Sequence, residues 1–178
     1  MNIQDLPFLP VYFDRYITQI PGDLELQDAF EQFAPEVIFN DTDLLLQLGD
    51  QVYAPGKWTA KDILQHCIDT ERIMTYRALC ISRGETISLP GFEENLYAQN
   101  TVAATRTVED LLDEYNTVRL ATRMLFQHMS EAMMLRTGSA NNAPITPLAI
   151  AYMILGHAVH HKNMLVERYY PLLTSNGV

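Results

Sequence analysis

The sequence is poor in basic residues. Twelve lysines and arginines stand against 22 aspartates and glutamates in a chain of 178 residues, and the formal net charge is −10. No cluster of lysine and arginine occurs anywhere in the chain. A protein that wraps nucleic acid or binds an anionic lipid surface needs a basic face, because phosphate contacts supply most of that affinity. The composition therefore argues against nucleic-acid and membrane partners and favours a small-molecule substrate.

Cysteines and long apolar runs are also scarce. The two cysteines, Cys67 and Cys80, cannot form a disulfide scaffold. On one helix they would lie about 20 Å apart, too far for a bridge. The first residues lack the features of a signal peptide, and no charge-free apolar run of about eighteen residues suggests a membrane span, the closest being 143–159. We therefore expect reduced thiols and a cytoplasmic protein.

What the chain does contain is enough apolar side chain, 48% of its residues, to fill one sizeable core. Apolar residues recur with helical spacing in four segments, and no alternating pattern typical of strands occurs. Pro35 should kink or break the first segment, and Gly84 should end the second. The expected order is an N-terminal arm (1–22), helices over 23–48, 59–83, 107–129 and 146–170, and a C-terminal tail (171–178).

The link between the second and third helices, about residues 84–106, is unusually long. Such a link can carry the chain back along the bundle, so that these two helices run parallel, whereas a tight turn would force them antiparallel. The sequence thus predicts an all-α protein, a four-helix bundle over residues 23–170. Thr59, with Asp62 three residues on, resembles a capping box at the start of the second helix.

Histidines mark the expected functional site. His157 and His161 are four residues apart, so both imidazoles lie on one face of the fourth helix, within an apolar stripe. Polar groups there are costly unless they have partners. A third imidazole would complete a site for one divalent ion, and His66 is better placed than His128 or His160 because it lies beside the apolar stripe of the second helix. The alternative is that these histidines only pack in the core.

Three segments of the chain resemble the DinB-like superfamily, which includes YfiT-like metal-dependent hydrolases. They are Ala54-Pro55-Gly56-Lys57-Trp58-Thr59 with Lys61-Asp62-Ile63-Leu64, His66 and Ile68-Asp69-Thr70-Glu71-Arg72; Leu89-Pro90-Gly91-Phe92-Glu93-Glu94-Asn95; and Gly156-His157 with His160-His161. The resemblance implies a bundle with up-down-down-up topology. It also implies a metal site made of His66, His157 and His161.

Other residues near these histidines have less certain roles. Relatives often carry a glutamine shortly after the last histidine, where this chain has Lys162 and Asn163. Asp62 and Asp69, four before and three after His66, are candidates to orient an imidazole, since ligating histidines usually donate their second N–H to such a group. For Asp62, a capping carboxylate is an equally good interpretation. Cys67 follows His66 directly, points about 100° away and is expected in the core.

The expected function is that of a metal-dependent enzyme. Three neutral imidazoles leave the +2 charge of an ion uncompensated, and such an ion acidifies water or a thiol bound to it. Two reactions follow, hydrolysis and transfer of a low-molecular-weight thiol, and the thiol S-transferases among the relatives favour bacillithiol-type chemistry. Zinc and nickel both suit imidazole ligands. The alternative is a non-catalytic stress protein that binds a metal or a small ligand.

The fourth helix also predicts an interface. It has a second apolar line, opposite the histidines, made of Leu148, Tyr152, Leu155, Val159 and Val166. A helix that is apolar on both sides is either fully buried or shared with a partner. We therefore expect a homodimer through this helix, unless the N-terminal arm covers the same face.

Overall fold

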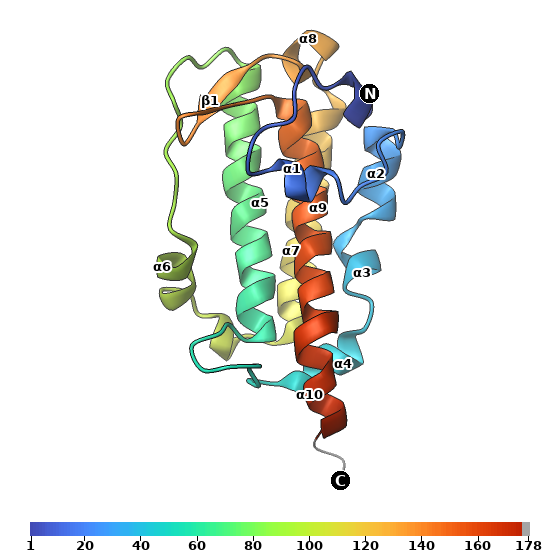
Figure 1. Ribbon diagram of the computed structural model, residues 1–178, viewed down its shortest axis with the longest axis vertical. Helices are drawn as coiled ribbons and strands as arrows, with labels where there is room; N and C mark the ends of the chain where they lie inside the picture. The colour runs from blue at the N-terminus through green and yellow to red at the C-terminus, as the bar shows by residue number, and fades with distance from the viewer. Residues whose placement is uncertain (176–178) are drawn as a thin grey trace.

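The computed structural model describes residues 1–175 as a bundle of long helices with short elements at its ends (Figure 1). In chain order the elements are η1 (Ile3–Asp5), α1 (Asp14–Ile17), α2 (Leu26–Gln32), α3 (Pro35–Ile38), α4 (Thr42–Leu48), α5 (Ala60–Ser82), α6 (Glu94–Gln99), η2 (Ala103–Thr105), α7 (Val108–Gln127), α8 (Glu131–Met134), β1 (Gly138–Ala140), β2 (Ala143–Ile145), α9 (Pro147–Met164), η3 (Leu165–Tyr169) and α10 (Tyr170–Ser175). No helix within residues 1–175 has the length and apolar character needed to cross a membrane.

The predicted topology is confirmed. In Figure 1 the chain descends through α2, α3 and α4, rises in α5, returns along the outside through the link, rises again in α7 and descends in α9. The helices α5 and α7 are therefore parallel, as the long link predicted. Both of them begin at a capping side chain: Thr59 and Asp62 form the predicted capping box, now complete, and the Thr107 side chain accepts from the backbone N–H of Asp110.

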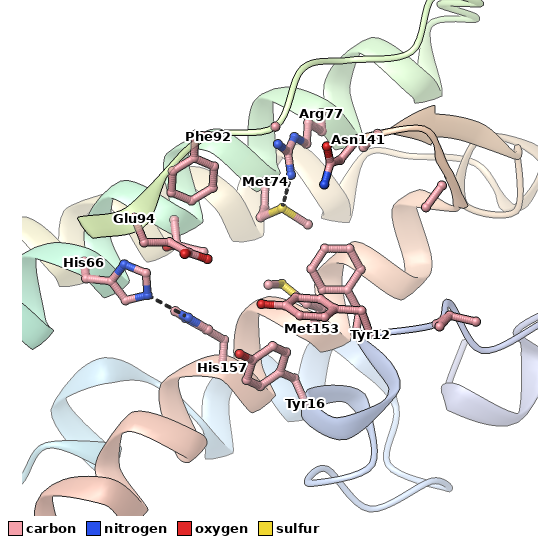
Figure 2. Close-up of a pocket in the computed structure, with 16 residues that line it drawn as sticks. Tyr12, Tyr16, His66, Met74, Arg77, Phe92, Glu94, Asn141, Met153 and His157 are labelled. Atoms are coloured by element: carbon pink, nitrogen blue, oxygen red, sulfur yellow. Dashed lines mark hydrogen bonds between the residues drawn. The ribbon is translucent and has the colours of Figure 1, made fainter. Parts of the chain in front are cut away.

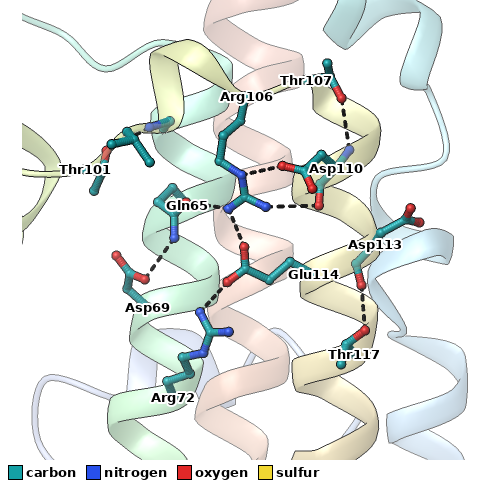
Figure 3. Close-up of polar contacts among 12 residues, drawn as sticks. Gln65, Asp69, Arg72, Thr101, Arg106, Thr107, Asp110, Asp113, Glu114 and Thr117 are labelled. Atoms are coloured by element: carbon teal, nitrogen blue, oxygen red, sulfur yellow. Dashed lines mark hydrogen bonds and ion pairs between the residues drawn. The ribbon is translucent and has the colours of Figure 1, made fainter.

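A polar network ties the returning link to the two parallel helices (Figure 3). Arg106, at the end of the link, donates to Gln65 of α5 at 3.0 Å and pairs with Glu114 of α7. Glu114 also pairs with Arg72 of α5. One carboxylate thus accepts from arginines on two different segments, which fixes the end of the link against α5 and α7.

The first predicted helix, over 23–48, breaks at Pro35 as expected. A second break, which was not predicted, divides it further, so that the segment forms α2, α3 and α4. Pro35 ends the first piece, because it has no N–H to donate, and occupies the first turn of α3, where that donor is not needed. A second break falls at Asn40 and Asp41, residue types whose side chains compete with helical hydrogen bonds and favour helix ends.

The end of the fourth helix is also corrected. The prediction ended it at residue 170 and made 171–178 a tail, but η3 is a wide π turn that leads directly into α10, through Pro171 to Ser175. The Tyr170 N–H bonds back five residues to the Leu165 carbonyl. Because Pro171 then falls in the first turn of a new segment, its missing N–H costs little. Residues 176–178 of the predicted tail lie outside the described residues.

Two short strands were not predicted. β1 and β2 form an antiparallel hairpin between α8 and α9, and Leu89 of the link forms a bridge to Ala140. Asn141 and Asn142 both have positive φ, 50° and 59°, as the tightest hairpin turns require. Three-residue strands are too short to show an alternating pattern, so the Asn-Asn pair was the only signal in the sequence.

The N-terminal arm packs on the bundle, against the second apolar line of α9. Leu148, Tyr152 and Leu155 are fully buried within the single chain, whereas Val166 is 46% exposed. The Tyr152 hydroxyl lies 3.2 Å from the carbonyl oxygen of Met1, at the start of the arm, and donates to the Leu24 carbonyl, just after the arm, at 2.6 Å. Most of the face that motivated a dimer is therefore covered by the chain itself. A homodimer through this helix stays a prediction, and light scattering at micromolar concentration tests it; a monomeric mass would contradict it.

Candidate metal centre

Three imidazoles from two helices meet inside the bundle. His66 lies on α5, and His157 and His161 lie one turn apart on α9. Their Nε2 atoms converge: the Nε2 of His157 is 3.1 Å from that of His66 and 3.1 Å from that of His161. Within residues 1–175, these three side chains form a cluster whose potential ligand atoms all lie within 4.8 Å of one another. The structure thus brings together the three predicted histidines.

Burial keeps these imidazoles uncharged. His157 and His161 are each 5% exposed. Loss of solvent, together with the neighbouring histidines, lowers the pKa of both well below 6.5. The same cause lowers the pKa of His66 to about 4. At neutral pH each ring therefore offers a lone pair, which is the form that binds a metal ion.

Hydrogen bonds among the three rings do not account for their arrangement. A ring nitrogen has one position in its plane, which holds either a proton or a lone pair. The Nε2 of His157 can therefore make a good hydrogen bond with only one of its two neighbours. A cation among three lone pairs satisfies all of them, and nitrogens bound to a tetrahedral ion at about 2.0–2.1 Å lie about 3.3 Å apart. The donor set fits one divalent ion.

The rings are held in place by close packing. Trp58 packs on His66, with ring centroids 4.8 Å apart, and Tyr16 of the arm meets His157 edge-on at 5.2 Å. The arm can approach α9 so closely because residue 156 is glycine: a Cβ there would lie 1.9 Å from the Tyr16 carbonyl oxygen. Gly156 thus allows Tyr16 to pack against His157, the residue that follows the glycine.

A cavity of about 190 Å³ opens beside His66 and His157. Figure 2 shows these histidines at one end and Arg77 and Asn141 at the other. Its walls come from α5, α9, the N-terminal arm, the hairpin and the segment of the link around Phe92 and Glu94. The centre therefore faces a partly open space large enough for part of a small molecule.

Comparisons with known proteins agree with this fold. A sequence model of the DinB superfamily matches residues 25–165, most of the chain. The chain belongs to the DinB superfamily. Among solved structures it is similar to YfiT from Bacillus subtilis, described as a probable metal-dependent hydrolase with an unusual four-helix bundle topology. The TM-score is 0.67 at 17% identity, over 82% of this chain and 87% of that one, and this likeness concerns the fold. No curated protein sequence matches the chain.

The other histidines of this DinB superfamily member lie apart from the three Nε2 atoms. His128 is exposed at the C-terminal end of α7. His160 is half-buried and packs on Tyr16, with ring centroids 5.3 Å apart. The choice of His66 as the third histidine of the cluster agrees with this geometry.

Asp62 and Asp69, the predicted orienting carboxylates, have other partners. Asp62 accepts from the Thr59 N–H at 2.9 Å in the capping box, and Asp69 accepts from the Gln65 amide at 3.0 Å. Both line a small cavity next to His66, but no hydrogen bond joins either of them to an imidazole within the described residues. The interpretation of Asp62 as a capping residue accounts for its contacts, and the orienting role of Asp69 stays a prediction.

The cysteines take no part in the centre. Cys67 is buried in the core, and burial raises the pKa of its thiol well above the usual range. Cys80 is half-buried, and neither forms a disulfide. The cytoplasmic location that the scarcity of cysteines suggested stays a prediction.

Two charged residues of the cavity were missed by the sequence reasoning. Glu94, the first residue of α6, lines the cavity next to His66 (Figure 2). Its segment stood out as part of the long link and of the family resemblance, but Glu94 itself was not singled out, and an acidic residue in that link was the available signal. Arg77 is buried on α5. Helical periodicity alone cannot distinguish it from an arginine that reaches solvent.

Proposed function

We propose that this protein is a metal-dependent enzyme that hydrolyses a small molecule at the three-histidine centre. The observation that carries the proposal is the convergence of three neutral Nε2 atoms beside a cavity that His66 and His157 line. A merely structural metal site is normally closed by a fourth protein ligand. Here the histidines adjoin a cavity instead, so a reacting molecule has room to approach. The description of YfiT as a probable hydrolase supports the same reaction class.

His66, His157 and His161 would hold the ion, and zinc and nickel both suit this donor set. A divalent ion bound there supplies positive charge that acidifies a water or thiol next to it and polarises an oxygen of the substrate. The neutral state of the rings matters for binding the ion, because protonated imidazoles would repel it.

Glu94 is the candidate general base. Its carboxylate belongs to the cavity wall that also contains His66, and within the described residues it is not paired with any arginine or lysine. A carboxylate in that position can take a proton from an attacking water and return it to the leaving group. The same group would carry out both proton transfers, on one face of the substrate.

Tyr16 is the candidate hydrogen-bond donor to the substrate. Its hydroxyl oxygen accepts from Arg15 at 2.9 Å, which leaves its own O–H available on the cavity side. A donor there would stabilise negative charge that develops on a substrate oxygen. Because Tyr16 belongs to the arm, the packing of the arm on α9 completes the site.

Thiol transfer is the second candidate. The specific observation in its favour is that all three candidate ligands are neutral, so no protein anion reduces the charge available to hold a thiolate. Glu94 would then accept the thiol proton. Bacillithiol-type thiols remain the expected cofactor class under this candidate.

The test uses protein purified without a nickel column, then stripped of metal and reloaded with zinc or nickel. Ester hydrolysis and conjugation of a small thiol, such as bacillithiol or cysteine, to an electrophile are measured in each form. We expect turnover only in the loaded forms. Glu94→Gln should retain the ion and lose roughly 10²–10⁴-fold in turnover.

Glu93→Gln is the matched control, because Glu93 is the exposed neighbour that caps α6 outside the cavity. It should leave both rates unchanged. Activity that survives complete removal of the metal would refute the proposal. Tight metal binding without turnover of any substrate would favour the alternative, a non-catalytic binding protein.

A further inference from the structure

Arg77 is a buried cation in the wall of the cavity. It is 4% exposed and lies on α5, with its guanidinium at the end of the cavity away from the histidines (Figure 2). One nitrogen donates to the Pro90 carbonyl at 2.6 Å, and another lies 3.1 Å from the sulfur of Met74, which is a weak acceptor. The third, Nε, is buried and has no hydrogen-bond partner among the described residues.

No carboxylate compensates this charge. Within residues 1–175, no aspartate or glutamate forms an ion pair with Arg77. Burial lowers the pKa of Arg77, and no neighbouring acid acts in the opposite direction. A buried charge without a partner is costly, and proteins retain one where a function requires it. The guanidinium still has N–H donors to satisfy, and the cavity is the space beside it.

We propose that Arg77 binds a carboxylate of the substrate or of its thiol co-substrate. The planar fork of a guanidinium matches the two oxygens of a carboxylate. One cation balances one negative charge, which favours a carboxylate over a doubly charged phosphate. Asn141 of the hairpin turn lines the same end of the cavity and offers an amide beside the guanidinium.

The proposal also gives the ligand a shape. Arg77 follows His66 by eleven residues on α5, so their Cα atoms are about 16 Å apart along the helix. Between the two ends the cavity is lined by Met74, Phe92 and Met153. The ligand would be elongated, with a carboxylate at one end and an apolar middle. Only the position of its reacting group, at the histidine end, rests on the proposed function.

A purely structural role is the competing explanation, because Arg77 also attaches the link to α5 through Pro90. The two roles differ in what a substitution does to ligands. Loss of an attachment would disturb the whole wall and weaken binding of charged and neutral ligands alike. Loss of a carboxylate-binding group would weaken only the charged ones.

The test compares hexanoate and octanoate with their primary amides, by calorimetric or NMR titration of the metal-loaded protein. We expect wild type to bind each carboxylate at least about tenfold more tightly than its amide, the scale of one charge-assisted hydrogen bond. Arg77→Gln should bring this ratio to about one without loss of bound metal. Arg77→Lys, which keeps the charge but loses the fork, should give an intermediate ratio.

Arg136→Gln is the matched control, since Arg136 also donates to a backbone carbonyl at 2.6 Å, that of Ser82, but lies outside the cavity. The preference of this variant for each carboxylate over its amide should equal that of wild type. Repeating the titrations on metal-stripped protein separates the two cations, because a preference due to Arg77 survives stripping and one due to the ion does not.

Three outcomes would overturn the proposal: no preference in wild type, a preference that persists in Arg77→Gln, or an equal loss for both members of each pair. Circular dichroism identifies a variant that fails to fold, in which case Arg77→Lys decides. Because turnover is not measured, absence of enzymatic activity would refute the proposed function and leave this result intact.

Discussion

Helix α5 carries two buried charges, of which one has an ion-pair partner and the other has none within residues 1–175. Glu71 is 1% exposed and accepts three hydrogen bonds from Arg119 of α7, at 2.9, 3.0 and 3.1 Å. Arg119 uses its remaining nitrogen to donate to the Phe33 carbonyl at 2.6 Å. Arg77, six residues after Glu71, has a single carbonyl and a thioether sulfur. The first charge is satisfied by the fold, and the second remains available to a ligand.

The histidines are a third case, since they are buried without being charged. Burial and mutual proximity suppress the protonation of His157 and His161, so they need no counter-ion. What they lack is a partner for their converging lone pairs. The comparison therefore separates groups that complete the bundle, such as Glu71 and Arg119, from groups that are complete only when something binds.

The largest expected effect is loss of the metal. Alanine at position 66, 157 or 161 removes one of three ligands, and we expect the content of about one divalent ion per chain to fall to near zero. His128→Ala and His160→Ala should retain the ion, because neither ring joins the three Nε2 atoms. Elemental analysis of each purified variant measures this. Unchanged metal in His66→Ala would show that the third ligand is a different residue.

Breaking the satisfied pair should cost the most stability. Glu71→Gln leaves the buried guanidinium of Arg119 without its counter-ion, and we expect a loss of about 3–5 kcal/mol in the free energy of unfolding. Urea denaturation followed by circular dichroism measures it. As a control, Arg72→Gln breaks a pair whose arginine side chain is 51% exposed, and it should cost less than about 1 kcal/mol. Similar losses in both variants would contradict the distinction.

Acid should destabilise the metal-free protein. The three histidines have pKa values below 6.5 in the folded state, and that of His66 is about 4, whereas in the unfolded chain they titrate near 6.5. Between these values the unfolded state binds more protons, so stability falls as the pH is lowered from 6.5 towards 4. Thermal unfolding across this range should show a decline in wild type that is smaller in His157→Ala. Equal slopes in the two proteins would contradict it.

Much of the bundle could be predicted because its signals are local. Helix starts are marked by hydrogen bonds made within one turn, as in the capping box of Thr59 and Asp62. The Thr107 and Thr146 side chains likewise accept from an N–H three residues on. The spacing of His157 and His161 similarly depends only on the helix itself. The length of the link was enough to indicate parallel helices, since a link between parallel helices must span the length of the bundle and one between antiparallel helices need not.

The features that were missed depend on contacts between distant segments. Whether Arg77 has a carboxylate partner, as Glu71 has an arginine, is decided by what α7 and the link bring near α5. Glu94 enters the site because the link folds back past His66. The continuation of the helix through Pro171 depends on the π turn before it, which periodicity does not reveal.

Among the buried charges, the smallest expected effect on stability is that of Arg77→Gln, and it is the sharpest test of the comparison. Removing Arg77 loses its bond to the Pro90 carbonyl, which as a charge-assisted hydrogen bond is worth about 1.5–3 kcal/mol. It also removes the cost of holding an unpaired cation in a cavity wall, which is of similar size and opposite sign. Glutamine keeps an amide that can donate near the same carbonyl. We therefore expect the free energy of unfolding to change by less than about 1 kcal/mol, measured in the same urea series as Glu71→Gln. A loss as large as that of Glu71→Gln would mean that the fold itself depends on Arg77, and the distinction between the two buried charges would not hold.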